Sequence, residues 1–153
     1  DAIICFKTAA GKDGFIAIET KYSENLGTNE ASNTDKAIET IRQLSCFNSD
    51  FEERINKKKT KLTQIYRNFL LSERYGLWIG AESYSIVLSP ELHPSTDDEV
   101  LSVTNEMRPE YKGKLQSITL ESFTNKLISE SPEEYAEIFR RFRDRYLSFE
   151  RVE

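Results

Sequence analysis

Two apolar stretches separated by a short polar segment constrain the fold more than any other feature of this sequence. "DAIICFK" at residues 1–7 and "FIAIETKY" at residues 15–22 are both rich in Ile and Phe, and "TAAGKDG" between them carries two glycines and an aspartate. This pattern is typical of two strands joined by a short reversing loop. The sequence therefore predicts a β-hairpin in its first 22 residues.

Charged residues at the end of this hairpin need an explanation, because a strand has no structural need for them. Side chains alternate between the faces of a strand, so Glu19 and Lys21 point the same way. Folding the hairpin about residue 11 or 12 brings Asp1 level with Lys21 or Ser23, and both registers place Asp1 on the face of Glu19 and Lys21. Two carboxylates and an ammonium are thus expected to converge.

Such a convergence is a suitable seat for a hard divalent cation, because Mg²⁺ prefers one or two carboxylates and keeps several waters. A neighbouring lysine can orient a water or stabilise charge on a phosphoryl oxygen, which is the chemistry of phosphodiester hydrolysis. Charged residues at strand ends are also common as solvated faces, so the triplet Glu19 to Lys21 alone leaves both interpretations open.

The combination of an Asp opening one apolar strand, a tight hairpin and E-x-K ending the next strand resembles the PD-(D/E)XK nuclease superfamily. The motif falls on Asp1 and on Glu19, Thr20 and Lys21. The resemblance implies that Asp1, Glu19 and the backbone carbonyl of Thr20 hold Mg²⁺ (or Mn²⁺), and that Lys21 positions the attacking water.

The sequence looks closest to a bacterial branch of this superfamily, in which the triplet is followed by Tyr and a small-Glu pair, as in "ETKYSE" here. That branch has a Gln-x-x-Arg element on a later helix, which "QIYRNFLL" matches through Gln64 and Arg67. The resemblance adds Gln64 to the catalytic residues. The superfamily core begins with a helix and a first strand, and this sequence starts after both, so we expect it to be a piece of a longer chain.

The remaining elements follow from the spacing of apolar residues and from residue types that begin or end helices and strands. A short helix is predicted at residues 34–44. The main buried helix is predicted at residues 49–76 and ends at Gly76, and a strand that ends at Pro90 is predicted at residues 77–91. Residues 95–107 predict a helix, and residues 115–128 a short strand or loop leading into another. The stretch 131–149 predicts the last helix, with Ser131 as cap, a proline in its first turn and Glu134 completing a capping box.

Two charged stretches offer weaker signals. "INKKKTK" at residues 55–61 could contact phosphates or form a solvated face. The arginines of the last helix, at positions 140, 141, 143 and 145, lie off a seam of four aromatic residues. We expect this seam, consisting of Tyr135, Phe139, Phe142 and Tyr146, to be core, and the arginines to be solvated or paired with glutamates.

Composition excludes several classes of protein. A length of 153 residues fits a single domain, here a core over 1–90 and a helical extension over 91–153. No apolar run approaches the roughly 20 residues needed to span a bilayer. Cys5 and Cys46 fit neither a metal motif nor a disulfide framework, so we expect buried thiols and a cytoplasmic location. The net charge of -5 restricts any nucleic-acid contact to a local patch.

The sequence thus predicts an α/β domain, with a small mixed sheet flanked by helices, that acts as a Mg²⁺-dependent nuclease on DNA. The alternative is an inactive nuclease-like module for DNA binding or protein interaction in a defence or repair assembly. A complete acidic triad with room for a metal favours the enzyme, and a salt-bridged Glu19 and Lys21 packed under side chains favours the module. The edge of the first strand is expected to be bare or covered by another chain, as in a homodimer, and this piece alone to be inactive or very weak.

Overall fold

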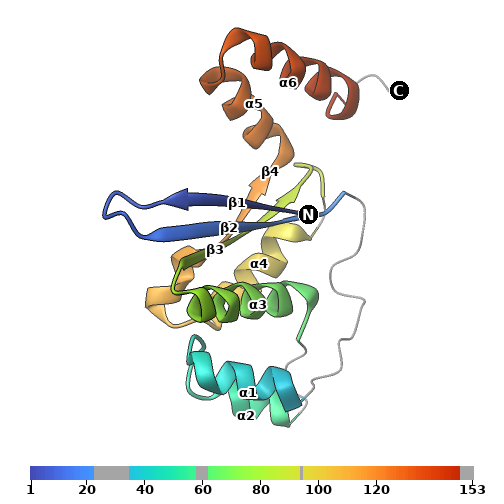
Figure 1. Ribbon diagram of the computed structural model, residues 1–153. Coiled ribbons are helices and arrows are strands. Elements are labelled where there is room, and N and C mark those ends of the chain that lie inside the picture. The colour runs from blue at the N-terminus through green and yellow to red at the C-terminus, as the bar shows by residue number, and fades with distance from the viewer. Residues whose placement is uncertain (23–34, 58–61, 94, 149–153) are drawn as a thin grey trace.

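The computed structural model describes residues 1–22, 35–57, 62–93 and 95–148. Strands and helices alternate along these ranges after an initial hairpin (Figure 1). In chain order the elements are β1 Ala2–Lys7, β2 Asp13–Thr20, α1 Asp35–Leu44, α2 Phe51–Asn56, α3 Gln64–Ile79, β3 Glu82–Ser89, α4 Thr96–Asn105, the 3₁₀ helix η1 Pro109–Lys114, β4 Leu115–Thr119, α5 Leu120–Glu130 and α6 Glu133–Tyr146.

The strands form one mixed sheet in the order β1-β2-β3-β4. β1 and β2 are antiparallel, whereas β2, β3 and β4 run parallel to one another. This confirms the predicted α/β class with a small mixed sheet that starts with a hairpin. β4 lies beyond residue 90, in the stretch expected to be a helical extension, and it adds a strand to the sheet. β1 lies at an edge and, among the described residues, pairs with β2 alone.

The hairpin loop fixes how the first two strands align. The Thr8 N–H donates to the Lys12 carbonyl over 2.8 Å, and the Gly11 N–H donates to the Thr8 carbonyl over 2.8 Å. Gly11 adopts a φ of 78°, a conformation that favours glycine. The loop is therefore centred one or two residues earlier than expected, and Ala2 pairs with Ile18.

Helices cover the two faces of the sheet unequally (Figure 1). α3 and α4 lie against one face, with α1 and α2 beyond them, and this side holds the main core. α5 and α6 lie on the other side, where a smaller cluster forms. The main core contains Ile41, Cys46, Phe47, Phe51, Ile55, Leu62, Ile65, Tyr66, Phe69, Leu70, Val87, Val100, Val103, Met107 and Leu115. The smaller cluster contains Ile18, Leu88, Leu120 and Leu147.

The main helix differs from its prediction at both ends. The stretch 49–76 contains the short α2 and the first part of α3, and residues 58–61 lie outside the described part of the chain. α3 continues past Gly76 and ends at Ile79, capped by Gly80, which has a left-handed φ of 70°. Gly76 instead allows close packing, because a Cβ there would lie 2.9 Å from the Ser83 Oγ. The following strand accordingly begins at Glu82 rather than at Leu77.

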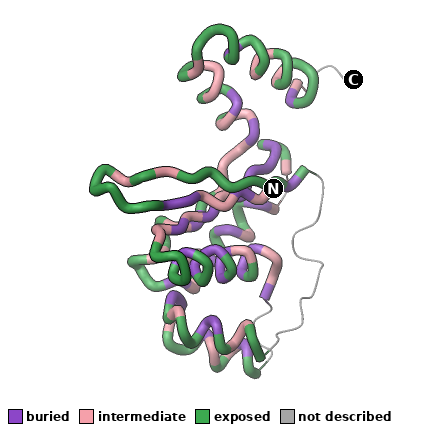
Figure 2. Tube along the Cα trace, in the orientation of Figure 1, coloured by how far each residue is buried: buried purple, intermediate pink, exposed green. Residues whose placement is uncertain are grey.

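The prediction for α6 is wrong in two respects. The helix begins at Glu133 after Pro132, without a side-chain capping hydrogen bond. Its aromatic seam is not core: the side chains of Tyr135, Phe142 and Tyr146 are 52%, 38% and 47% exposed. α6 packs on α5 through the side that carries Ala136, and most of its remaining surface is open (Figure 2). Periodicity shows that a helix is amphipathic but not what covers its apolar face.

The two cysteines have different surroundings. Cys46 is fully buried in the main core, as predicted, but Cys5 is exposed because it lies on the edge strand β1. Among the described residues, no helix combines the length and the apolar character that crossing a bilayer requires.

Candidate active site

The candidate site lies where the carboxyl end of β2 meets the first turn of α3. Lys21 directly follows β2, and its backbone N–H donates to the Leu88 carbonyl over 2.7 Å, which extends the parallel pairing with β3. Gln64 is the first residue of α3. β2 and α3 run in opposite directions across this contact, since Phe15 at the start of β2 packs on Tyr75 near the end of α3. The end of one element is thus held against the beginning of the other.

Four polar side chains meet at this junction. The Lys21 Nζ lies 2.7 Å from the Glu19 Oε1 and donates to the Gln64 Oε1 over 2.9 Å. The Gln64 Nε2 donates to the same Glu19 oxygen over 2.8 Å. The Asn68 Nδ2 donates to the Glu19 Oε2 over 3.0 Å. Each oxygen of the Glu19 carboxylate therefore accepts at least one hydrogen bond, and Gln64 links the cation to the anion.

This cluster is largely removed from water. The side chains of Lys21 and Glu19 are only 7% and 14% exposed. Lysine and glutamate are seldom buried unless they are paired, because taking a charge out of water is costly. Replacing a buried ion pair by well-packed apolar residues is often neutral or stabilising, so the burial of this pair is weak evidence for a contribution to stability.

Asp1 completes the set from the neighbouring strand. With Ala2 opposite Ile18, Asp1 lies beside Glu19, rather than level with Lys21 or Ser23 as expected. The shift is two or four residues, an even number, so the odd-numbered residues still share a face and Asp1, Glu19 and Lys21 line one cleft. The Asp1 side chain is exposed, and its Oδ1 accepts a hydrogen bond of 3.3 Å from the Thr20 N–H.

The cleft has a volume of about 620 Å³ and lies between β1, β2 and α3. Its polar end is formed by the four-residue cluster and Asp1. Its other walls are mainly apolar and include Ile3, Phe15, Ala17, Leu71 and Tyr75. A concave surface with a few convergent polar groups at one end is the usual form of a binding or catalytic site.

Oxygen ligands for a cation are few. Within the described ranges, no group of three or more His, Cys, Asp or Glu side chains is placed to hold a metal ion. Two carboxylates, those of Asp1 and Glu19, remain at adjacent positions of adjacent strands. This donor set suits a hard cation such as Mg²⁺, which takes one or two carboxylates and retains water ligands.

Sequence reasoning missed one member of the cluster, and one residue of the matching helix element lies outside it. Asn68 was not singled out, although it lies four residues after Gln64 and hence on the same helix face. Arg67, which belonged to the Gln-x-x-Arg element, is exposed and lies outside the cluster and the cleft. The i, i+4 spacing of two amide side chains was the signal available for Asn68.

The basic run at residues 55–61 is only partly described. Lys57 forms an exposed ion pair with Glu53 on the preceding helical turn, and the lysines at 58, 59 and 61 lie outside the described residues. His93 contacts Thr96, with 2.8 Å between the Nδ1 and the threonine Oγ1, and is separate from the cleft.

Comparison with known proteins gives one result that covers nearly the whole chain. Neither the curated proteins nor the solved structures give a match. A family model does match, over residues 1–147, and the family is described as a restriction endonuclease associating with ARP. The match includes Asp1, the Glu19 to Lys21 triplet and Gln64. The chain therefore belongs to this restriction-endonuclease-like family, REase-ARP, which confirms the resemblance seen in its motifs.

Proposed function

We propose that this protein is a metal-dependent nuclease that hydrolyses phosphodiester bonds in DNA. The observation that carries the proposal is the open cleft at whose polar end Asp1 and Glu19 lie on adjacent strands beside Lys21, which Gln64 orients. Membership of a restriction-endonuclease-like family supports the same reaction class. The catalytic group in this proposal comprises Asp1, Glu19, Lys21 and Gln64.

The carboxylates of Asp1 and Glu19, with the backbone carbonyl of Thr20, would hold Mg²⁺ or Mn²⁺. When bound, such a cation would polarise a phosphoryl oxygen and offset the charge that develops during hydrolysis. Glu19 can take part only if the hydrogen bonds that it now accepts rearrange. Asp1 is exposed and accepts a hydrogen bond of 3.3 Å from the Thr20 N–H, so it is the more accessible of the two carboxylates.

Lys21 would act on the attacking water and on the developing negative charge. Its ammonium group has three donors, and Gln64 orients it through a hydrogen bond of 2.9 Å. Gln64 also contacts Glu19, so it would position the lysine relative to the carboxylate. A donor that is fixed before the reaction stabilises a transition state without further reorganisation.

A second function is favoured by the buried contact between Lys21 and Glu19. Each oxygen of Glu19 already accepts a hydrogen bond, Lys21 is buried against it, and a cation would have to compete with that ammonium. This is the arrangement expected of an inactive nuclease-like module that binds DNA or a protein. The family description names association with ARP, and we propose that ARP is the protein partner in that case.

Cleavage and binding of DNA, measured together, distinguish the two functions. The protein would be incubated with supercoiled plasmid and Mg²⁺, alongside Lys21→Met and a matched Lys7→Met control, whose lysine is 69% exposed on β1. A nuclease should lose nearly all cleavage in Lys21→Met, retain its DNA affinity within a few-fold, and be unaffected in Lys7→Met.

The other outcomes are equally informative. DNA or ARP binding without cleavage at any Mg²⁺ or Mn²⁺ concentration would select the module. Cleavage that survives in Lys21→Met would reject the assigned role of the lysine. Absence of cleavage, DNA binding and ARP binding would contradict both functions.

A further inference from the structure

The last helix, α6, carries an apolar stripe that no part of the described chain covers. The stripe consists of Tyr135, Ile138, Phe142 and Tyr146, whose side chains are 52%, 59%, 38% and 47% exposed. The spacings of three, four and four residues place all four on one face of a helix. A row of large apolar side chains in water is unfavourable and usually marks an interaction surface.

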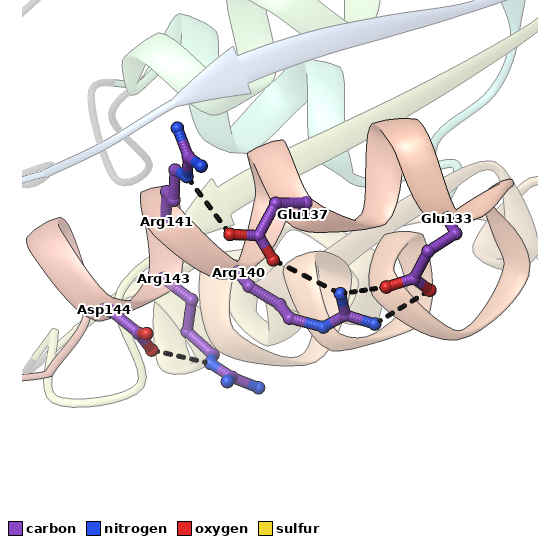
Figure 3. A network of polar contacts seen from close by, with 6 residues as sticks. All are labelled: Glu133, Glu137, Arg140, Arg141, Arg143 and Asp144. Atoms are coloured by element: carbon purple, nitrogen blue, oxygen red, sulfur yellow. Dashed lines mark hydrogen bonds and ion pairs between the residues drawn. The ribbon is translucent and has the colours of Figure 1, made fainter.

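Ion pairs link other side chains of α6 to one another, and those in Figure 3 involve no residue of the stripe. Arg140 contacts Glu133 and Glu137 over 2.7 Å and 3.4 Å, and Arg141 contacts Glu137 over 3.1 Å. Arg143 contacts Asp144 over 3.4 Å.

The net charge of α6 argues against nucleic acid as the partner. Four arginines on α6 are balanced by three glutamates and one aspartate, so the helix has no net charge. A surface that binds nucleic acid needs a surplus of positive charge to neutralise phosphates. The α6 surface is therefore better suited to a protein partner than to DNA.

The order of residues in the stripe identifies that partner. Read in either direction, the stripe runs from a tyrosine through two large apolar residues to a tyrosine. If two α6 helices pack antiparallel about residue 140, Ile138 of one lies across from Phe142 of the other, and Tyr135 lies within one residue of the position across from Tyr146. The stripe is thus complementary in size and chemistry to a second copy of itself, as a two-fold interface requires.

The charges beside the stripe fit the same arrangement. The first half of α6 is acidic and its second half is basic. Glu134 and Arg145 flank the stripe on the side away from α5, and neither forms an ion pair with a carboxylate or a basic side chain within the described residues. The Arg145 guanidinium lies over the Tyr146 ring, 5.2 Å from its centre. Antiparallel packing brings Glu134 of each copy next to Arg145 of the other.

We propose that two copies of this protein associate through α6, stripe to stripe and antiparallel, with two Glu134–Arg145 contacts across the interface. α6 packs on α5 in each copy, so the contact joins two helical hairpins into a four-helix arrangement. A helix of 14 residues is about 21 Å long, which makes this interface small and the association weak.

A charge-reversal experiment tests the proposal. Sedimentation velocity would follow the protein between roughly 1 and 100 μM, where a small interface of this kind is expected to pass from monomer toward dimer. Glu134→Arg and Arg145→Glu should each weaken association by about tenfold or more, because the interface contains this contact twice and each variant turns both copies into contacts between like charges. The double variant restores opposite charges and should associate within a few-fold of the unmodified protein.

The controls separate this interface from other effects. Glu110→Arg makes the same charge change at an exposed position on η1 and should leave association unchanged. Circular dichroism checks that each variant is folded. A protein that stays monomeric over the whole range would overturn the proposal. Single variants that associate as strongly as the unmodified protein would overturn it as well. So would a double variant whose association is weakened by the two single effects added together.

Discussion

Replacing Lys21 by methionine tests how strongly the buried ion pair of the candidate site is coupled to the fold. The Lys21 Nζ lies 2.7 Å from the Glu19 Oε1, which corresponds to an attraction of about 6 kcal/mol at an effective dielectric constant of 20. Burying two ions costs several kcal/mol each, so the pair as a whole contributes little net stability. Removing one partner, however, leaves the other charge buried and uncompensated.

The expected magnitudes follow from this imbalance. Lys21→Met preserves the volume of the side chain but leaves the Glu19 carboxylate with only the amide donors of Gln64 and Asn68, so it should lower the free energy of unfolding by about 3 kcal/mol. Glu19→Gln should cost about 2 kcal/mol, because the Lys21 ammonium then loses its counter-ion. The double variant removes both charges and should lose no more than about 2 kcal/mol, well below the additive value of about 5.

Urea denaturation followed by circular dichroism provides the measurement, with an unchanged m value showing that the folded and unfolded states remain comparable. The matched cycle uses Lys7→Met and Asp13→Asn on the hairpin, whose side chains are 69% and 73% exposed and whose coupling should be at most about 1 kcal/mol. If the Glu19 and Lys21 variants were additive, or if Lys21→Met were as stable as the unmodified protein, the burial argument for this site would be wrong.

Two further predictions concern the scaffold. Gly76→Ala should destabilise the protein by about 1–2 kcal/mol in the same urea assay, because its Cβ would lie 3.0 Å from the Ala81 backbone oxygen; Gly113→Ala, with open space around it, should be neutral or slightly stabilising. Burial raises the pKa of the Cys46 thiol from 9.0 to about 12, so between these values the unfolded state binds fewer protons. Stability should be complete below pH 9 and fall above it by up to about 1.4 kcal/mol per pH unit, and Cys46→Ala should show a smaller fall over the same range.

The parts of the fold that sequence predicts correctly depend on local pattern. The hairpin follows from alternating apolar residues around a Gly- and Asp-containing loop, and its odd-numbered face follows from strand geometry alone. The exact register requires knowledge of which residues close the loop, and the observed pairing of Ala2 with Ile18 is two or four residues away from the two expected registers. Because the shift is even, the candidate site remained on one face despite the error.

The parts that sequence does not predict depend on contacts between distant segments. Gly76 looks like a helix end, but it is required where α3 approaches Ser83, and Gly80 ends the helix instead. The aromatic seam of α6 looks like core because periodicity cannot show whether another element covers it. Asn68 joins Glu19 only because the fold places α3 against the end of β2.

Cation binding at Asp1 and Glu19 is the most direct test of the proposed nuclease function. Titration of Mn²⁺ followed by calorimetry should show one site in the unmodified protein, lost or at least tenfold weaker in Asp1→Asn and in Glu19→Gln. Asp13→Asn, which removes an exposed carboxylate from the same hairpin, should bind Mn²⁺ as the unmodified protein does. Equal Mn²⁺ binding in all four proteins, or no binding in any of them, would contradict a cation site formed by these two carboxylates.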